Sequence, residues 1–429
     1  MESPTEEPSP TLFTKPIFLL FGIGALLAYN AFLTELPFFN TFLPDLSPGK
    51  SIPLLNFVLN ITFQLLILCK KDLFNLKIQL ISGLICSIVF LILIPIVVIY
   101  LERNSFINMA ITSVLILIMG FVNALLTSGF YSLASFFPLE NIIALNTGMA
   151  IAGILMNVIQ YMVLIFVDSG DEEKDIIICA LIFFSISGFI LLLCLIILLF
   201  QFQTDYYKYY LRTLFSNKKN ISIENVDNLV IDSVQTDSEK GKTENNNSET
   251  KEEAKKELTF MEMFHLLKDI DFLGMYIYII TASLYPNAVI SQQLYNISKK
   301  YNINTILIII NTGDTIGRYL VGKVKPTKKL TYIVILSRTI LLVTILFNFY
   351  LEKRKNSIEL TGTFLLINII ALSISNGVGT SLCFGIAPTL VDDEYKGQAG
   401  ASVSFFATLG TFIGTILAYL TSEIMTLLS

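Results

Sequence analysis

Long apolar runs constrain this chain more than any other feature. They recur along its 429 residues at about 16–39, 51–69, 76–100, 106–137, 141–167, 176–203, 269–290, 302–322, 330–350, 360–389 and 398–425. A helix needs about 20 apolar residues to cross the hydrocarbon core of a bilayer. Because 54% of the residues are hydrophobic and only 15% are charged, a soluble globular domain is excluded. The sequence therefore predicts an all-α polytopic membrane protein with about 11 transmembrane helices.

Charged connections between the runs predict the orientation of the chain. If the N-terminus is cytoplasmic, the basic connections at 70–77 and 323–329 fall on the cytoplasmic side, and the acidic connection at 168–175 falls outside. Cytoplasmic loops are generally rich in lysine and arginine. An odd number of spans then leaves the C-terminus outside. We expect an integral, multi-pass protein of the plasma membrane, with residues 1–15 as a cytoplasmic N-terminal tail that lacks the basic start of a signal peptide.

A long polar segment divides the spans into two groups. Residues 204–268 separate six runs at 16–203 from five runs at 269–429. The centre of this segment, 237–256, is charged, rich in Asn and Ser, and almost free of apolar residues. Such a composition cannot bury enough apolar surface to fold. We expect a largely disordered cytoplasmic loop between an N-terminal six-helix bundle and a C-terminal five-helix bundle. The end of the segment differs, because apolar residues at helical spacing in 257–271 predict either an interfacial helix that leads into the seventh span or the frayed start of that span.

One apolar run contains two opposite charges. Asp314 and Arg318 stand four residues apart, so a helix places them on one face, about 6 Å apart along its axis. An ionisable residue at the centre of a spanning helix costs about 2.5–3.5 kcal/mol and normally faces the bundle interior with a partner. Two interpretations are open: a buried ion pair that only fixes helix register, and a polar site in a water-filled cavity, which we favour. Gly313 and Gly317 form a smooth strip beside the pair, where another helix or a ligand could approach closely.

Other polar residues also fall within apolar runs, where each amide needs a partner because water is absent. We select Asn123, Gln160 and Asn376 as supporting or gating residues. Pro286 joins them because a proline breaks helical hydrogen bonds, as in the kinked helices that line a transporter cavity. The sequence has no phosphate-binding loop, no metal-ligand cluster and no nucleophile motif. We therefore expect no enzymatic activity, no metal and no cofactor.

Several motifs resemble, in their order and spacing, those of the equilibrative nucleoside transporter family. GDTIGR at 313–318 is similar to the family's Asp-x-x-Gly-Arg in the eighth span, and SNGVGTSLCFGIAP at 375–388 is similar to its Ser-Asn-Gly tenth span. Further support comes from GALLAYNAF at 24–32, GFVNALLTSGFYSLASFFP at 120–138, Pro286, and the LSR motif that ends at Arg338. We add Arg338 to the supporting or gating residues. The resemblance implies a major-facilitator-like architecture, in which bundles of six and five helices rock around a central cavity.

The resemblance also implies a substrate-binding site. Tyr29 and Asn30 stand at the family's Trp-Asn pair, and Thr127 stands where many members have glutamine. Asp314 and Arg318 match the family motif directly. Two departures leave the substrate preference open, because the chain has no tryptophan and Thr127 cannot offer a carboxamide to a base or a ribose.

The implied function is facilitative transport of nucleosides, nucleobases or both by alternating access. The expected partners are the small-molecule substrate and the lipid bilayer, with no nucleic acid and with the oligomeric state left open. One alternative is a polyspecific or organic-cation carrier of the same fold, in which Glu35 or Asp314 would recognise the cation. Another is a battenin-like, non-transporting protein of intracellular membranes. The Asp314–Arg318 pair and the polar fourth and tenth spans favour a carrier, because a non-carrier would not need them.

Overall fold

The computed structural model describes residues 14–70, 75–167, 172–211, 259–285, 289, 292–295, 299–324, 326–353 and 358–427. Over these residues the chain is helical and contains no strand, which confirms the predicted all-α fold. Its long helices are α1 (Thr14–Thr34), α3 (Pro48–Cys69), α4 (Leu76–Tyr100), α5 (Phe106–Ser135), α6 (Leu139–Phe166), α7 (Glu172–Gln201), α10 (Phe260–Leu284), α12 (Lys299–Val321), α13 (Lys328–Lys353), α14 (Ile358–Ile386) and α15 (Lys396–Leu427). Short helices are α2 (Leu36–Phe42), η1 (Pro44–Leu46), α8 (Asp205–Tyr210), η3 (Ala387–Leu390) and η4 (Asp393–Tyr395). Most of the predicted tail, the central part of the predicted loop, and Pro286 lie outside the described residues.

Two of the long helices, α10 and α12, carry buried acidic side chains. The other nine are long and apolar enough to cross a membrane by length and composition, within the part of the chain that the structure describes. Asp271 in α10 and both Asp314 and Arg318 in α12 are nonetheless buried. They are buried because α10 packs along α15 and α12 packs along α14. A helix that turns its charges into the bundle can therefore span the fold without being uniformly apolar.

The helix α10 begins at Phe260, before the predicted loop boundary at residue 268 and within the stretch 257–271 that we predicted to be helical. A capping box explains this difference: Thr259 Oγ1 accepts a hydrogen bond from the Glu262 N–H at 3.3 Å, and Glu262 Oε2 accepts one from the Thr259 N–H at 2.8 Å. The pair satisfies two backbone donors that the first turn would otherwise leave free. The first long helix of the C-half therefore starts at Phe260, well before the apolar run that marked the predicted span.

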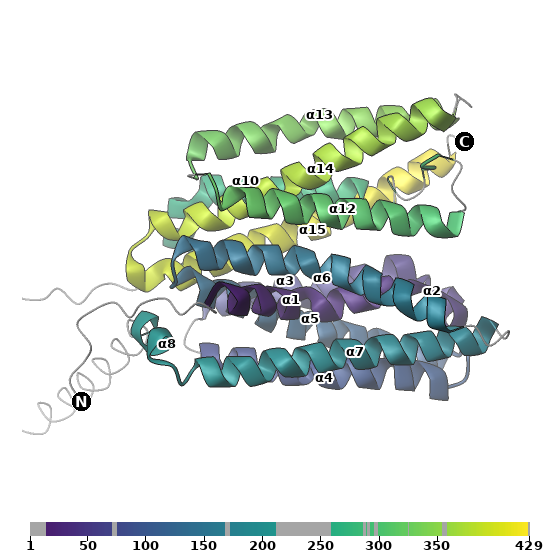
Figure 1. Cartoon of the computed structure of the whole chain (residues 1–429), viewed down its shortest axis with the longest axis horizontal. Coiled ribbons are helices and arrows are strands. Elements are labelled where there is room, and N and C mark those ends of the chain that lie inside the picture. The colour runs from purple at the N-terminus through teal and green to yellow at the C-terminus, as the bar shows by residue number, and fades with distance from the viewer. Residues whose placement is uncertain are drawn as a thin grey trace, which may run out of the picture.

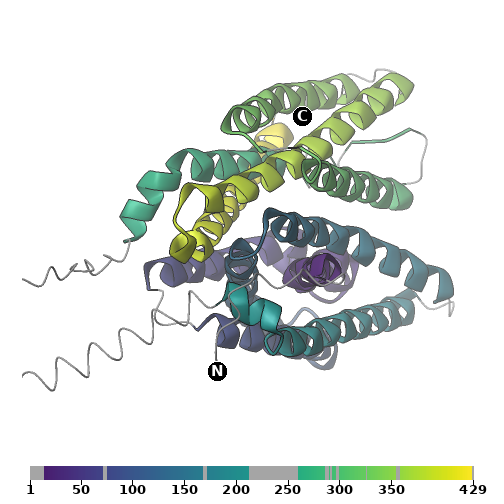
Figure 2. The same ribbon diagram turned by 60° about the vertical axis from the view of Figure 1, so that its left-hand side comes forward.

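The long helices form two bundles (Figures 1 and 2). In the N-half (α1–α7), α1 packs on α6, and α5 packs on α3 and α4; in the C-half (α10–α15), α10 packs on α15 and α12 on α14. The two halves meet where α6 contacts α12 and α14, and where α3 and α5 contact α15. We call the end that carries α8 the inner end and the end that carries α2 the outer end (Figure 1). The predicted orientation places the inner end in the cytoplasm.

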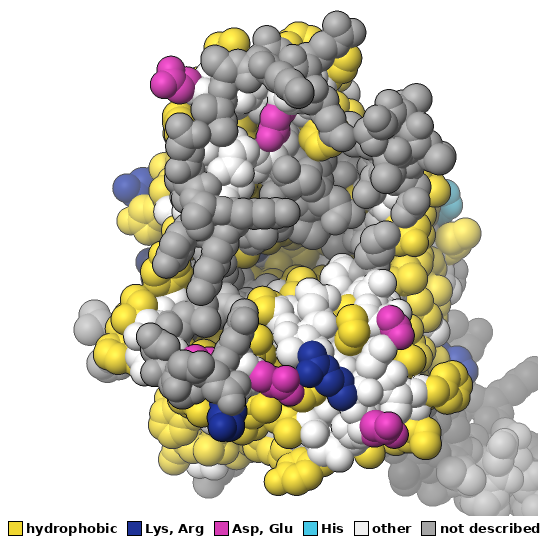
Figure 3. All heavy atoms as spheres, turned by 90° about the vertical axis from the view of Figure 1, so that its right-hand side faces the viewer, with side chains coloured by type: hydrophobic (Ala, Val, Ile, Leu, Met, Phe, Trp, Pro, Cys, Tyr) yellow, Lys and Arg dark blue, Asp and Glu magenta, His cyan; other side chains and the backbone are white. Residues whose placement is uncertain are grey.

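The outer end carries exposed acidic side chains among polar ones (Figure 3). Asp45, Glu102 and Glu173 are exposed there, and Glu173 pairs with Arg103 at 3.0 Å. Exposed basic side chains lie at both ends, with Lys323 in an inner-end connection and Arg103 and Lys174 at the outer end. Acidic side chains such as Glu140 and Asp205 are likewise exposed at the inner end. The orientation therefore stays a prediction from the basic connections.

Glycines bring α12 and α14 into direct backbone contact. A Cβ atom on Gly317 would collide with the carbonyl oxygen of Ile374, and one on Gly377 would collide with the carbonyl oxygen of Asp314. A Cβ on Gly313 would also meet a side chain of α14. The strip that we predicted beside the charged pair is therefore a helix contact, and α14 occupies it.

We expect Gly377→Ala to destabilise the folded protein, because its new Cβ would push α14 away from α12. Overpacking of this kind costs about 1–3 kcal/mol, which outweighs the roughly 1 kcal/mol by which alanine favours a helix over glycine. Gly188 of α7 is the matched control, since nothing lies within 4 Å of a Cβ placed there. The apparent melting temperature in detergent should fall for Gly377→Ala and hold or rise for Gly188→Ala. Equal melting temperatures for the two variants would contradict the close backbone contact of α14 with α12 at Gly377.

Candidate functional site

Asp314 and Arg318 form the buried ion pair that their spacing predicts. Arg318 Nε donates to Asp314 Oδ2 at 2.9 Å across one turn of α12, and the two side chains are only 6% and 11% exposed, respectively. Because water reaches neither group freely, every remaining donor and acceptor of the pair has to be satisfied by protein.

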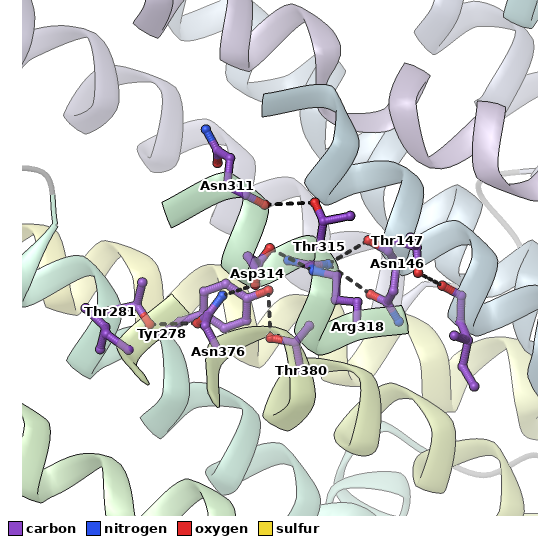
Figure 4. Close-up of polar contacts among 12 residues, drawn as sticks. Asn146, Thr147, Tyr278, Thr281, Asn311, Asp314, Thr315, Arg318, Asn376 and Thr380 are labelled. Carbon is purple, nitrogen blue, oxygen red and sulfur yellow. Dashed lines mark hydrogen bonds and ion pairs between the residues drawn. The ribbon is translucent and has the colours of Figure 1, made fainter. Parts of the chain in front are cut away.

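The second oxygen of Asp314 ties α12 to the rest of the C-half (Figure 4). Asn376 Nδ2 of α14 donates to Asp314 Oδ1 at 2.7 Å. The Oδ1 atom of Asn376 lies 2.7 Å from the Thr281 hydroxyl of α10. Three helices of the C-half therefore converge on one carboxylate, and the sequence prediction of Asn376 as a supporting residue falls within this network.

A second buried arginine joins the same network. Arg338 of α13 is fully buried, and its Nη1 donates to the carbonyl oxygen of Leu372 at 3.0 Å and to Ser375 Oγ at 2.8 Å. Its Nη2 reaches the Thr281 hydroxyl. The network thus holds two guanidinium groups for the one carboxylate of Asp314.

Arg318 also crosses from the C-half to the N-half. Its Nη1 donates to the carbonyl oxygen of Asn146 in α6 at 3.0 Å, with Asn146 Oδ1 at 3.3 Å (Figure 4). Tyr131 of α5 donates to the same Oδ1 at 2.7 Å, and the Tyr131 ring stacks on Phe384 of α14 with centroids 3.7 Å apart. Asn146 Nδ2 is buried and has no hydrogen-bond partner among the described residues. The charged pair of one half is therefore bonded to the backbone of the other.

Thr127 lies in a separate polar cluster in α5. Its hydroxyl donates to the carbonyl oxygen of Asn123, one turn earlier, at 2.7 Å, and accepts from Gln64 Nε2 of α3 at 3.2 Å. Among the described contacts, none joins Thr127 to Tyr29, whose ring lies 5.6 Å from that of Phe57 in α3. The structure thus brings together Asp314 and Arg318 but leaves Thr127 in a different part of the interface.

The remaining predicted residues have local partners. Asn30 is half-buried on α1. Asn123 Nδ2 donates to Asn56 Oδ1 of α3 at 3.1 Å. Gln160 Nε2 donates to the carbonyl oxygen of Thr34 at 2.9 Å, which joins α6 to the outer end of α1. These contacts support the packing of the N-half, and the binding or gating roles of the residues stay predictions.

Sequence reasoning missed Asn146, Gln64, Tyr131 and Thr281 as members of these networks. Asn146 and Gln64 carry the signal that selected Asn123, which is an amide inside an apolar run, and it could have found them. Nothing local reveals that Asn146 meets Arg318, since the two are 172 positions apart.

Two hollows lie at the interface of the halves. A cavity of about 520 Å³ at the inner end is lined from both halves, by residues that include Phe136, Leu139 and Pro388. A groove of about 270 Å³ lies between α6 and α12, lined by Val158, Tyr161, Met162, Thr305 and Ile308. Neither hollow is lined by Asp314 or Arg318. The described residues contain no cluster of His, Cys, Asp and Glu that could hold a metal ion.

We expect Asp314→Asn and Arg318→Leu each to destabilise the protein by about 3–5 kcal/mol, because each leaves a buried charge without its partner. The double variant should be less destabilised than either single variant. The exposed pair Lys15–Glu140 is the control, with side chains 63% and 65% exposed, so that Lys15→Met should change stability by at most about 1 kcal/mol. Melting temperatures in detergent would compare the four proteins. If the loss of stability in the double variant equals the sum of the two single losses, the two charges are not coupled, and the prediction is contradicted.

Comparisons with known proteins complete the description of the site. The family model for the nucleoside transporter matches residues 113–423, and no individual curated protein is matched. Among solved structures, the chain is similar to the proton:xylose symporter XylE of the major facilitator superfamily, with a TM-score of 0.65 and 12% identity over 97% of this chain and 90% of XylE. It is also similar to the E. coli fucose:proton symporter FucP, with a TM-score of 0.60 and 12% identity over 97% of this chain and 93% of FucP. These similarities show the fold alone and confirm the predicted major-facilitator-like architecture. Because the family model covers most of the chain, the chain belongs to the nucleoside transporter family.

Proposed function

We propose that this membrane transporter is a facilitative carrier of nucleosides, nucleobases or both, and that it works by alternating access. The observation that carries the proposal is the buried Asp314–Arg318 pair, which is held by Asn376 on one side and reaches Asn146 of the other half. Ionisable residues inside a membrane domain are costly and commonly mark substrate pathways. The proposal also places the N-terminus in the cytoplasm, the C-terminus outside, and the protein in the plasma membrane.

The chemistry of the pair suits a nucleoside. A ribose presents hydroxyl donors that a carboxylate such as Asp314 can accept, and a base presents carbonyl oxygens and ring nitrogens to which a guanidinium such as Arg318 can donate. In this structure both groups are buried and line neither described hollow. A substrate therefore reaches them only when the two halves separate, which is the motion that alternating access supplies.

The charges of the network favour a neutral substrate over an organic cation. Arg318 and Arg338 bring two positive charges to the one negative charge of Asp314. Glu35, the other acid considered for a cation, continues the helical hydrogen bonding of α1 through its N–H to Ala31. Glu35 is buried at the junction of α1 and α2, and no described contact joins it to the network of Asp314. The organic-cation alternative thus has less support from the described side chains.

Tyr29, Asn30 and Thr127 remain proposed substrate residues. Tyr29 and Asn30 are half-buried on α1, so part of each side chain is exposed and accessible to a substrate. Thr127 already accepts a hydrogen bond from Gln64, so a substrate that used this hydroxyl would have to replace that contact. Its proposed role in selectivity therefore requires the Gln64 amide to give up Thr127, and Asn60 and Thr408 offer the amide other acceptors.

Transport by the purified protein in liposomes tests the proposal. Uptake of at least one radiolabelled compound among adenosine, uridine, guanosine, hypoxanthine and uracil should saturate, and neither ATP nor a sodium gradient should change it. Protein-free liposomes give the background, and uptake of radiolabelled tetraethylammonium tests the organic-cation alternative. Uptake of the cation without any purine or pyrimidine would overturn the proposal in favour of the cation carrier. No uptake by folded protein would favour the non-transporting alternative.

A further inference from the structure

The side chain of Gln64 joins the two halves near their inner ends. It is fully buried in α3. Its Nε2 lies 3.2 Å from Thr127 Oγ1 of α5 and 2.9 Å from Thr408 Oγ1 of α15, and its Oε1 accepts from Ser404 Oγ of α15 at 3.3 Å. Gln64 and Thr127 belong to the N-half, whereas Thr408 and Ser404 belong to the C-half. One carboxamide therefore donates and accepts hydrogen bonds across the interface.

The direction of these hydrogen bonds is fixed by the two threonines. Thr127 donates its proton to the carbonyl oxygen of Asn123 at 2.7 Å, and Thr408 donates its proton to the carbonyl oxygen of Ser404 at 2.9 Å. Each hydroxyl is then left to act as an acceptor, because a hydroxyl has only one proton to give. The amide nitrogen of Gln64 is the donor that both of them need.

The Gln64 amide keeps partners even when the halves separate. Its nitrogen has two protons but three acceptors within reach, because Asn60 Oδ1 of the same helix lies 2.7 Å away. Asn60 and Thr127 are both in the N-half, so the amide can lose Thr408 and still place both protons. The link to α15 can thus be broken without leaving a buried donor unpaired, which would otherwise oppose opening.

Apolar side chains border the polar cluster of Gln64 on the side of the inner end. One turn closer to the inner end, Leu68 of α3 packs in one cluster with Ala401, Phe405 and Phe406 of α15. Hydrogen bonds in such water-poor surroundings are electrostatically stronger than in water. The apolar contacts seal the interface, and the amide adds directional bonds that favour a single register of α3 against α15.

We propose that Gln64 is a reversible latch, which holds the inner ends of the two halves together and sets the share of molecules in this inner-closed arrangement. The proposal rests on the alternating access proposed above. Arg318 also links the two halves, through its hydrogen bond to Asn146. That link depends on the Asp314–Arg318 ion pair, which has to remain in place. Gln64 is neutral and has spare acceptors, so it can exchange partners at each opening.

The labelling rate of a cysteine buried between the inner ends measures how often these ends separate, and the experiment needs no substrate. Ala401→Cys places a thiol in the apolar interface, where Ala401 is 5% exposed, in a full-length protein whose five native cysteines are replaced by alanine. A hydrophilic maleimide reacts with this thiol only when the inner ends separate. Gln64→Ala should raise the labelling rate of the detergent-purified protein on the order of tenfold, since it removes two cross-half hydrogen bonds. Thr408→Val, which keeps the shape and removes one acceptor, should raise it by roughly threefold.

Two matched controls separate the latch from a general loosening of the fold. Gln79 is a buried glutamine whose Nε2 donates to the Leu125 carbonyl and to Ser128 Oγ, both at 2.9 Å and both within the N-half. Thr411 lies on α15 and donates only to the carbonyl oxygen of Ala407 among its described contacts. Gln79→Ala and Thr411→Val should leave the labelling rate unchanged.

The latch is overturned if Gln79→Ala accelerates labelling as much as Gln64→Ala does, or if Thr408→Val has no larger effect than Thr411→Val. These outcomes are distinct from a failure of the proposed function. A protein that opens through this latch but moves no nucleoside would support the latch and contradict only the substrate assignment. A protein that moves nucleosides while all variants label equally would contradict only the latch.

Discussion

The burial of Asp314 and Arg318 is the constraint on which much of the remaining structure depends. Two opposite charges taken out of water need complete satisfaction by protein groups. Asn376 can bond to Asp314 because Gly317 and Gly377 let α14 touch the backbone of α12. Arg318 Nη1 donates to the carbonyl oxygen of Asn146 in the N-half, which requires α6 to lie against α12. The packing of the C-half and its contact with the N-half thus both supply hydrogen-bond partners to the same ion pair.

The interface between the halves has to hold and also to open. Its apolar part, around Leu68 and Phe405, excludes water. Its polar links come from single side chains, Arg318 and Gln64. A typical hydrogen bond contributes about 0.5–1.5 kcal/mol net, so a few of them bias an equilibrium between two arrangements without locking it. A ligand with different affinities for the two arrangements can then shift their populations.

The fold could be predicted from the sequence to a large extent, because length and apolarity of a run decide whether a helix can span a membrane. The Asp314–Arg318 pair was predictable for a similar reason, since contacts four residues apart follow from helix geometry alone. The start of α10 lies within 257–271, where apolar residues at helical spacing predicted a helix ahead of the seventh span. Apolarity alone set the predicted boundary of the span itself at 269, whereas Thr259 and Glu262 carry the local capping signal for the true start of the helix. The partners Asn146 and Gln64 could not be assigned to their contacts, because those contacts join residues 172 and 344 positions apart and depend on how the halves meet.

The central claim is that the buried pair binds substrate in addition to holding helices together. Isothermal titration of the transported nucleoside or base into purified wild-type protein and into folded Asp314→Asn protein tests it most directly, because binding is measured apart from transport and expression. A hydrogen bond to a charged group is worth about 1.5–3 kcal/mol, so the account predicts at least a tenfold loss of affinity in Asp314→Asn. Equal affinity in the two folded proteins would contradict the account and leave the pair an architectural role alone.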